Sequence, residues 1–175
     1  MDAPRRVAVV GLGNVLMADD GLGPTVIKAL EAAYEFPPGV TVEDLGTPGL
    51  DLTPYIAGVE VLIIVDTVNA SGSAGELRTY TRDELLAHAP LPRVSPHDPG
   101  LKEALLTLEF AGTAPAEVLL VGVIPAVVDR GTDLSRAVAA AVPEAVERIV
   151  AELARLGVPA TPMATPKTPD LWWQR

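Results

Sequence analysis

Residues 7–23, VAVVGLGNVLMADDGLG, decide the fold of this chain. The apolar run from Val7 to Val10 predicts a strand that is buried on both faces. Gly11 and Gly13 then permit a tight turn, because they lack the side chain that would block close backbone approaches. An amphipathic helical pattern follows the turn. The stretch therefore delivers polar groups to the carboxyl end of a strand, where open α/β sheets hold their sites.

Two adjacent carboxylates, Asp19 and Asp20, stand directly before this helix. A carboxylate at such a position can cap the free N–H groups of a helix. One carboxylate is enough for capping, so the second is in surplus. We therefore expect one of the pair to cap the helix and the other to be available for function.

The composition limits the classes of partner. The chain of 175 residues suits one domain with a full core. Its formal net charge of -10 and the lack of a basic run argue against a nucleic-acid partner. The absence of cysteine excludes disulfides, thiol nucleophiles and thiolate metal sites. No signal region or bilayer-spanning apolar run is present, so we expect a cytoplasmic protein without a membrane partner.

Strand and helix patterns alternate along the chain. Further strands are predicted at residues 40–44, 61–65, 77–81 and 118–124, and helices at 22–34, 51–56, 83–88, 100–110 and 134–156. This order predicts an α/β fold, a three-layer α/β/α sandwich with a mostly parallel central sheet and one antiparallel edge strand. Pro143 should kink or restart the last helix. We expect a single domain over residues 1–157 and a Pro-rich C-terminal tail, 158–175, that is either mobile or docked locally.

A few polar residues follow the predicted strands. Asp20, Asp44 and Asp66 should project from one carboxyl edge of the sheet. His97 lies in a proline-rich loop before a helix. Two carboxylates and an imidazole would suit a divalent ion such as nickel, zinc or manganese and leave coordination positions open. Asp66 and Asp44 could instead be turn residues whose side chains bind the backbone, and this role is favoured for Asp44.

The glycine turn also invites a nucleotide-binding interpretation. The dinucleotide fingerprint would require a third glycine at position 16, where this chain has Leu16. Asp19 and Asp20 would repel a pyrophosphate at the helix N-terminus. The turn also lacks a phosphate-loop lysine. We therefore expect no nucleotide partner.

Taken together, the pattern resembles the hydrogenase maturation endopeptidases, which trim the C-terminus of the large subunit of nickel–iron hydrogenases. Their opening motif, G-x-G-N-x-L-x-x-D-[DE]-G-x-G, is matched by Gly11, Gly13, Asn14, Leu16, Asp19, Asp20, Gly21 and Gly23. Later family segments match, in order, Asp44–Thr47, the strand that ends at Asp66, Ser95–Leu101, Gly122–Pro125 and Leu134–Ser135. The resemblance covers roughly residues 6 to 156.

The resemblance implies the following roles. The metal-binding residues fall on Asp20, Asp66 and His97, and Asp20 stands where many members have the longer Glu. These residues would recognise nickel that is carried by the substrate, the precursor of a hydrogenase large subunit, so nickel is not a permanent cofactor. The candidate catalytic residues are Asp20, Asp66 and Asp44. The site would be supported structurally by Gly11, Gly13, Asn14, Asp19 and Gly21. With Asp20 assigned to the metal, Asp19 is left to cap the helix.

The mechanism of peptide hydrolysis stays open between two classes. The chain has no cysteine, no serine on a G-x-S-x-G turn and no HExxH helix. Either the bound nickel polarises the scissile carbonyl or activates a water, or Asp20 and Asp66, or Asp44, act as acid and base on a water. We therefore expect an aspartic-type or nickel-assisted protease. The alternative is a non-catalytic, metal-sensing maturation chaperone on the same fold.

Overall fold

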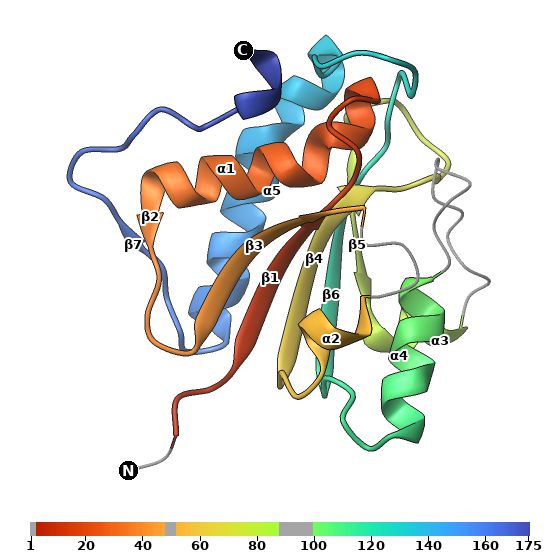
Figure 1. Ribbon diagram of the computed structural model, residues 1–175, viewed down its shortest axis with the longest axis vertical. Coiled ribbons are helices and arrows are strands. Elements are labelled where there is room, and N and C mark those ends of the chain that lie inside the picture. The colour runs from red at the N-terminus through yellow and green to blue at the C-terminus, as the bar shows by residue number, and fades with distance from the viewer. Residues whose placement is uncertain (1–2, 48–51, 88–99) are drawn as a thin grey trace.

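The computed structural model describes residues 3–47, 52–87 and 100–175 (Figure 1). A five-stranded sheet with the order β3-β1-β4-β6-β5 lies at its centre. The strands are β1 (Val7–Leu12), β3 (Val40–Gly46), β4 (Val61–Thr67), β5 (Leu77–Thr81) and β6 (Glu117–Val123). Strands β3, β1, β4 and β6 are parallel, and β5 pairs with β6 in the antiparallel direction. The mostly parallel sheet with one antiparallel edge is therefore as the sequence predicted.

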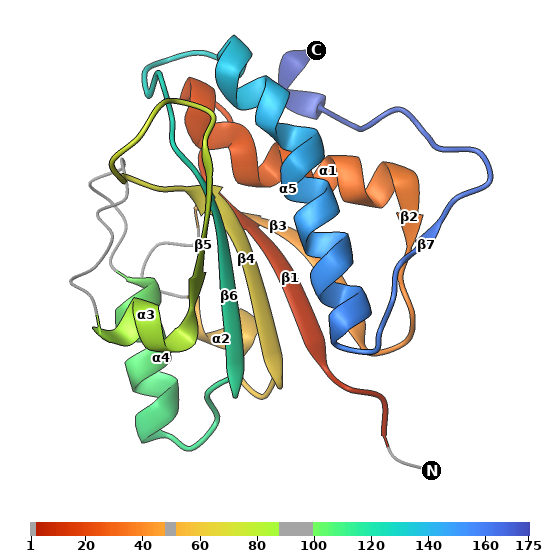
Figure 2. The same cartoon turned by 180° about the vertical axis from the view of Figure 1, so that it is seen from behind.

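Helices cover both faces of this sheet. The α-helices are α1 (Leu22–Ala33), α2 (Thr53–Ile56), α3 (Arg82–Ala87), α4 (Leu101–Phe110) and α5 (Arg136–Arg155). Helices α1 and α5 lie on one face, and α2, α3 and α4 lie on the other (Figures 1 and 2). The predicted three-layer α/β/α architecture is confirmed. Among the helices of the described ranges, none combines the length and the apolar character that crossing a membrane requires.

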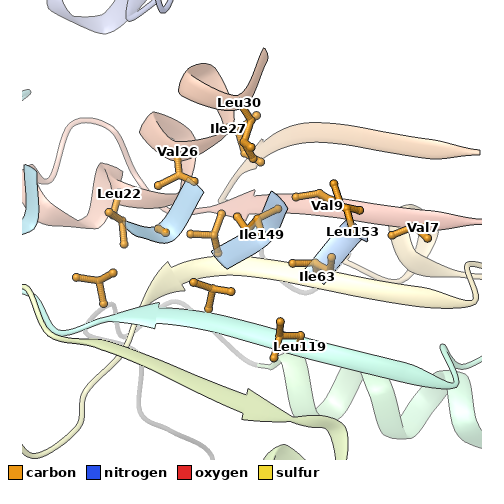
Figure 3. Packing of buried hydrophobic residues seen from close by; sticks show 14 of the residues in the cluster. Val7, Val9, Leu22, Val26, Ile27, Leu30, Ile63, Leu119, Ile149 and Leu153 are labelled. Carbon is orange, nitrogen blue, oxygen red and sulfur yellow. The ribbon is translucent and has the colours of Figure 1, made fainter. Parts of the chain in front are cut away.

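Alternate residues of the strands build the core beneath α1 and α5. Strand residues such as Val9 and Ile63 share one buried cluster with the apolar side of α1, and α5 adds Ile149 and Leu153 to it (Figure 3). All of these side chains are fully buried. The apolar residues that recur every 3.6 positions along the helices and every second position along the strands thus pack together in one cluster.

Glycine is required where α1 crosses the sheet. A Cβ atom at Gly23 would lie 2.2 Å from the Leu12 carbonyl oxygen and 2.6 Å from that of Val65. A Cβ atom at Gly11 would lie 2.6 Å from the carbonyl oxygen of Gly23. The first turn of α1 therefore rests directly on the backbone of β1 and β4. Gly11 and Gly23 of the opening motif therefore serve this close helix–strand packing.

The structure extends two of the predicted elements and corrects a third. Strand β3 continues to Gly46, and β4 continues through Asp66 and Thr67. Of the two outcomes expected at Pro143, a kink or a restart of the helix, the restart is wrong, since one helix runs through this residue. The apolar stripe of α5 is buried against the sheet on both sides of the proline. This packing outweighs the loss of one backbone hydrogen bond.

The C-terminal segment packs on the domain. Strand β7 (Thr161–Pro162) forms a small antiparallel sheet with β2 (Tyr34–Glu35), which the sequence patterns did not predict. Beyond it, the backbone nitrogens of Met163 and Lys167 donate hydrogen bonds to carbonyl oxygens in the last turn of α1. These bonds satisfy acceptors that a helix end leaves free. The short 3₁₀ helix η2 (Trp172–Gln174) then buries Trp173, so this segment is docked.

Candidate functional site

The candidate site lies at the carboxyl edge of the parallel strands. Strand β1 pairs with β3 on one side and with β4 on the other, and Gly11 lies opposite both Asp44 and Val65. Asp66 follows Val65 directly. Asp44 and Asp66 therefore flank the end of β1, as the sequence predicted. The turn that leaves β1 leads to the 3₁₀ helix η1 (Ala18–Gly21), which contains Asp20.

The turn after β1 folds back so that its backbone holds the Asp20 carboxylate. Gly13 has φ +138°, and a Cβ atom there would lie 1.8 Å from the carbonyl oxygen of Asp20. The backbone nitrogen of Asn14 donates a hydrogen bond to Asp20 Oδ2 at 2.8 Å. The side-chain oxygen of Asn14 accepts a bond from the nitrogen of Leu16 at 3.0 Å. Gly13 thus allows the close approach of the backbone at Asp20, and the Asn14 side chain stabilises the turn whose backbone binds this carboxylate.

Asp20 and Asp66 are both buried and both contact Thr67. Their exposed fractions are 5% and 3%, and that of Thr67 is 1%. The backbone nitrogen of Thr67 donates to Asp66 Oδ1 at 2.8 Å, and its hydroxyl donates to Asp20 Oδ1 at 3.4 Å. Sequence reasoning did not single out Thr67. The available signal was a hydroxyl residue that continues an otherwise apolar buried strand.

Asp44 makes the turn contact that its sequence context favoured. Its Oδ1 accepts a hydrogen bond from the backbone nitrogen of Gly46 at 2.9 Å. The carbonyl oxygen of Gly46 accepts one from the nitrogen of Gly13 at 2.8 Å. The end of β3 is thereby tied to the turn after β1. The Asp44 side chain is only partly buried, in contrast to those of Asp20 and Asp66.

The prediction that Asp19 caps α1 is wrong. Helix α1 begins at Leu22 without a side-chain cap, and Asp19 is fully buried beneath the loop between β6 and α5. Its Oδ2 accepts hydrogen bonds from the backbone nitrogens of Ala126 and Val127, both at 2.8 Å. Ser135 donates to the same carboxylate through its nitrogen and its hydroxyl. These donors come from a distant segment, which the local pattern of the sequence does not reveal.

The same loop also pairs with the turn through backbone hydrogen bonds. The nitrogen of Ala18 donates to the Gly131 carbonyl oxygen at 2.8 Å, and the nitrogen of Gly131 donates to that of Leu16 at 3.0 Å. Ala18 has φ 51°, a conformation that residues with a side chain adopt rarely. The strained turn is therefore held by the loop between β6 and α5 as well as by its own hydrogen bonds.

The predicted metal ligands are only partly described. His97 lies outside the described residues, as does His88. Within residues 3–47, 52–87 and 100–175, no three histidine, aspartate or glutamate side chains gather in a group that could hold a metal ion. Asp20 and Asp66 lie close together through their shared contact with Thr67. Carboxylate oxygens are hard ligands of a kind that fits a divalent cation.

Known proteins resemble this chain in sequence and in structure. The family model described as hydrogenase maturation protease matches residues 24–152. The hydrogenase 2 maturation protease of Escherichia coli (strain K12) is 35% identical over 157 residues, which are 90% of this chain and 96% of that protein. A hydrogenase expression/formation protein, HupD of Rhodobacter capsulatus, is 34% identical over 93% of this chain and 78% of its own length.

Solved structures agree with these relatives. The hydrogenase maturating endopeptidase HybD from E. coli superposes with a TM-score of 0.84 at 34% identity, over 91% of this chain and 98% of that chain. The [NiFe] hydrogenase maturation protease HybD from Thermococcus kodakarensis gives a TM-score of 0.66 at 30% identity, over 85% and 99% of the two chains. The matches in sequence and in structure show that the chain belongs to the hydrogenase maturation protease family.

Proposed function

We propose that this protease removes a C-terminal peptide from the nickel-loaded precursor of a nickel–iron hydrogenase large subunit. The observation that carries the proposal is the pair of buried carboxylates, Asp20 in η1 and Asp66 near the end of β4, which both bind Thr67 in a chain of this family. Related proteins are named as maturation proteases, and one of them as a [NiFe] hydrogenase protease. These names support the substrate class.

The nickel belongs to the substrate in this proposal. Asp20 and Asp66 supply hard oxygen ligands, and His97 adds the imidazole of a borderline set that suits nickel. These three protein ligands leave coordination positions for the ligands that the precursor itself provides. The metal would therefore complete the docking site, and cleavage would follow only after the metal has been inserted.

Asp44 is the residue that we assign to activation of the attacking water. Its carboxylate is partly exposed and uses Oδ1 for the bond from Gly46. The carboxylates of Asp20 and Asp66 are buried, and Asp20 has both oxygens engaged by donors. A general base must be within reach of the water from which it takes a proton. The accessible carboxylate fits this role better than the two buried ones, which are left to hold the nickel.

The test is to mix the protein with nickel-loaded and nickel-free precursor and to measure the intact mass of the precursor. We expect the loaded form alone to lose a C-terminal peptide. Equal cleavage of both forms would contradict recognition through nickel. Binding without any change in mass would favour the non-catalytic chaperone, which the naming of the relatives as endopeptidases argues against.

Three single substitutions test the ligand set. Asp20→Ala, Asp66→Ala and His97→Ala should each abolish processing while circular dichroism shows that the fold survives. Full activity in all three variants would remove the proposed site. Co-expression with each candidate large subunit, with and without nickel, then identifies which precursor is the substrate.

A further inference from the structure

Thr67 lies between the two buried carboxylates and binds each of them with a different group. Its backbone nitrogen donates to Asp66 Oδ1 at 2.8 Å, and its hydroxyl donates to Asp20 Oδ1 at 3.4 Å. It is the last residue of β4, and 1% of it is exposed. Asp66 precedes it in the strand and Val68 follows it, and both neighbours are buried.

The hydroxyl at this position is not explained by packing. Valine has nearly the same shape as threonine, and it would suit a buried strand end without a polar atom to satisfy. A buried hydroxyl is costly unless it forms a hydrogen bond. In this structure that bond goes to the carboxylate of Asp20.

We propose that Thr67 is a positioning residue whose hydroxyl orients the Asp20 carboxylate for the nickel of the substrate. This inference rests on the proposed function. Asp20 Oδ2 accepts a bond from the nitrogen of Asn14 at 2.8 Å, so its two oxygens are held from two separate segments of the chain. Two donors on different oxygens fix the rotation of a carboxylate, whereas one donor leaves it free to turn. Substitution of a group that orients a metal ligand commonly lowers metal affinity or activity by about 10- to 100-fold.

The structure allows this contact to be removed alone. The bond from residue 67 to Asp66 comes from the main chain and persists with any side chain other than proline. Thr67→Val therefore deletes the donor to Asp20 and keeps both the bond to Asp66 and the volume of the side chain. Thr67→Ser keeps the hydroxyl and loses only the methyl group.

The experiment compares wild type, Thr67→Val and Thr67→Ser, with Thr79→Val in β5 as the control for the same chemical change away from the site. Three quantities are measured: kcat and KM for the nickel-loaded precursor by intact mass, the affinity of the isolated protein for Ni²⁺ by calorimetry, and Tm. We expect Thr67→Val to lower kcat/KM and Ni²⁺ affinity by about 10-fold or more. Thr67→Ser should restore both quantities, and the control should match wild type.

Two results would overturn the inference. One is a Thr67→Val protein that equals wild type in Ni²⁺ affinity and in processing. The other is a Thr67→Ser protein that is as impaired as Thr67→Val, which would assign the effect to the methyl group and to packing. If Thr67→Val fails to fold, Thr67→Ala replaces it as the variant without a hydroxyl and is compared with Thr67→Ser in the same way.

Failure of the proposed function gives a different pattern. If wild-type protein leaves every precursor uncut, the proposed function fails. The Ni²⁺ affinities of the Thr67 variants still decide whether the hydroxyl orients Asp20, because that measurement needs no precursor.

Discussion

Ser135 donates two hydrogen bonds to the carboxylate of Asp19, from its backbone nitrogen to Oδ1 at 2.6 Å and from its hydroxyl to Oδ2 at 2.9 Å. The two residues are 116 positions apart in the sequence. Ser135 is also the N-cap of α5, where its hydroxyl accepts a bond from the nitrogen of Val138. One buried carboxylate therefore joins the turn that carries Asp20 to the start of the longest helix.

Replacing Asp19 by alanine should lower the free energy of unfolding by at least about 3 kcal/mol, because the N–H groups of Ala126, Val127 and Ser135 would lose their bonds to a charged acceptor that is itself fully buried. Denaturation in guanidinium chloride measures the loss. Asp129→Ala, an exposed aspartate in the same loop, is the control and should change stability by less than about 0.5 kcal/mol. A loss below about 1 kcal/mol for Asp19→Ala would contradict this account.

Gly23→Ala should destabilise the protein by at least about 3 kcal/mol or prevent folding, since the added methyl group would meet the backbone of β1 and β4. These strands cannot yield without disturbing the sheet. Gly131→Ala is the matched control, because the nearest atom to its added Cβ is 3.8 Å away. Thermal unfolding of the two variants makes the comparison. Equal Tm values would show that α1 can move off the strands at little cost.

Asp44→Asn separates the turn role of Asp44 from its proposed role as general base. Asparagine keeps the oxygen that accepts the bond from Gly46, so Tm should change little. It cannot take a proton from water, and we expect processing of the nickel-loaded precursor to fall by about 100-fold or more. Intact-mass kinetics give the rate. Processing within about twofold of wild type would return Asp44 to a structural role alone.

The ionised side chain of Glu117 should stabilise the folded protein near neutral pH, and this stabilisation should be lost in acid. Hydrogen bonds from Arg155 and then Arg5, at 2.7 and 2.5 Å, hold the pKa of Glu117 below its ordinary value of 4.5. The folded state thus favours the ionised form, and the resulting stability is present above pH 4.5 and is lost as the pH falls through the lower pKa of the folded protein. The side chain is 41% exposed, so solvent screening keeps the effect below about 1 kcal/mol.

Thermal unfolding of wild type and Glu117→Gln between pH 7 and pH 3 tests this expectation. The Tm of the variant should be lower at pH 7, and the difference should shrink progressively below pH 4.5. High salt at pH 7 should also reduce it, because exposed ion pairs are screened. A difference that is independent of both pH and salt would mean that the ion pairs with Arg5 and Arg155 are not its source.

Much of the architecture was predictable from short-range patterns. The apolar runs at β1 and β4 are buried on both faces, as the lack of alternation predicted. The parallel order then placed Asp44 and Asp66 at one edge of the sheet. These predictions succeeded because the period of apolar residues reports local structure, and because a parallel sheet aligns its strand ends. The roles of these aspartates in catalysis and metal recognition stay predictions, to be decided by the experiments above.

Other features depended on residues that meet only after folding. Pro143 breaks helices by its own chemistry, yet α5 continues through it because the sheet packs along its length. The C-terminal segment has few long apolar side chains, and it is docked by bonds to the end of α1 and by burial of Trp173. Neither the continuity of α5 nor the docking of the C-terminal segment can be predicted from local sequence, since the residues that stabilise each of them lie far away along the chain.

The opening stretch of the chain contains both kinds of information. By itself the sequence determined the strand, the glycine turn and the helix that follow one another from residue 7, because these depend on backbone freedom and on the spacing of apolar side chains. Only the tertiary structure decided what the two aspartates bind. A buried carboxylate takes whichever donors the fold brings to it, and here the loop before α5 reached Asp19 while Thr67 of β4 reached Asp20.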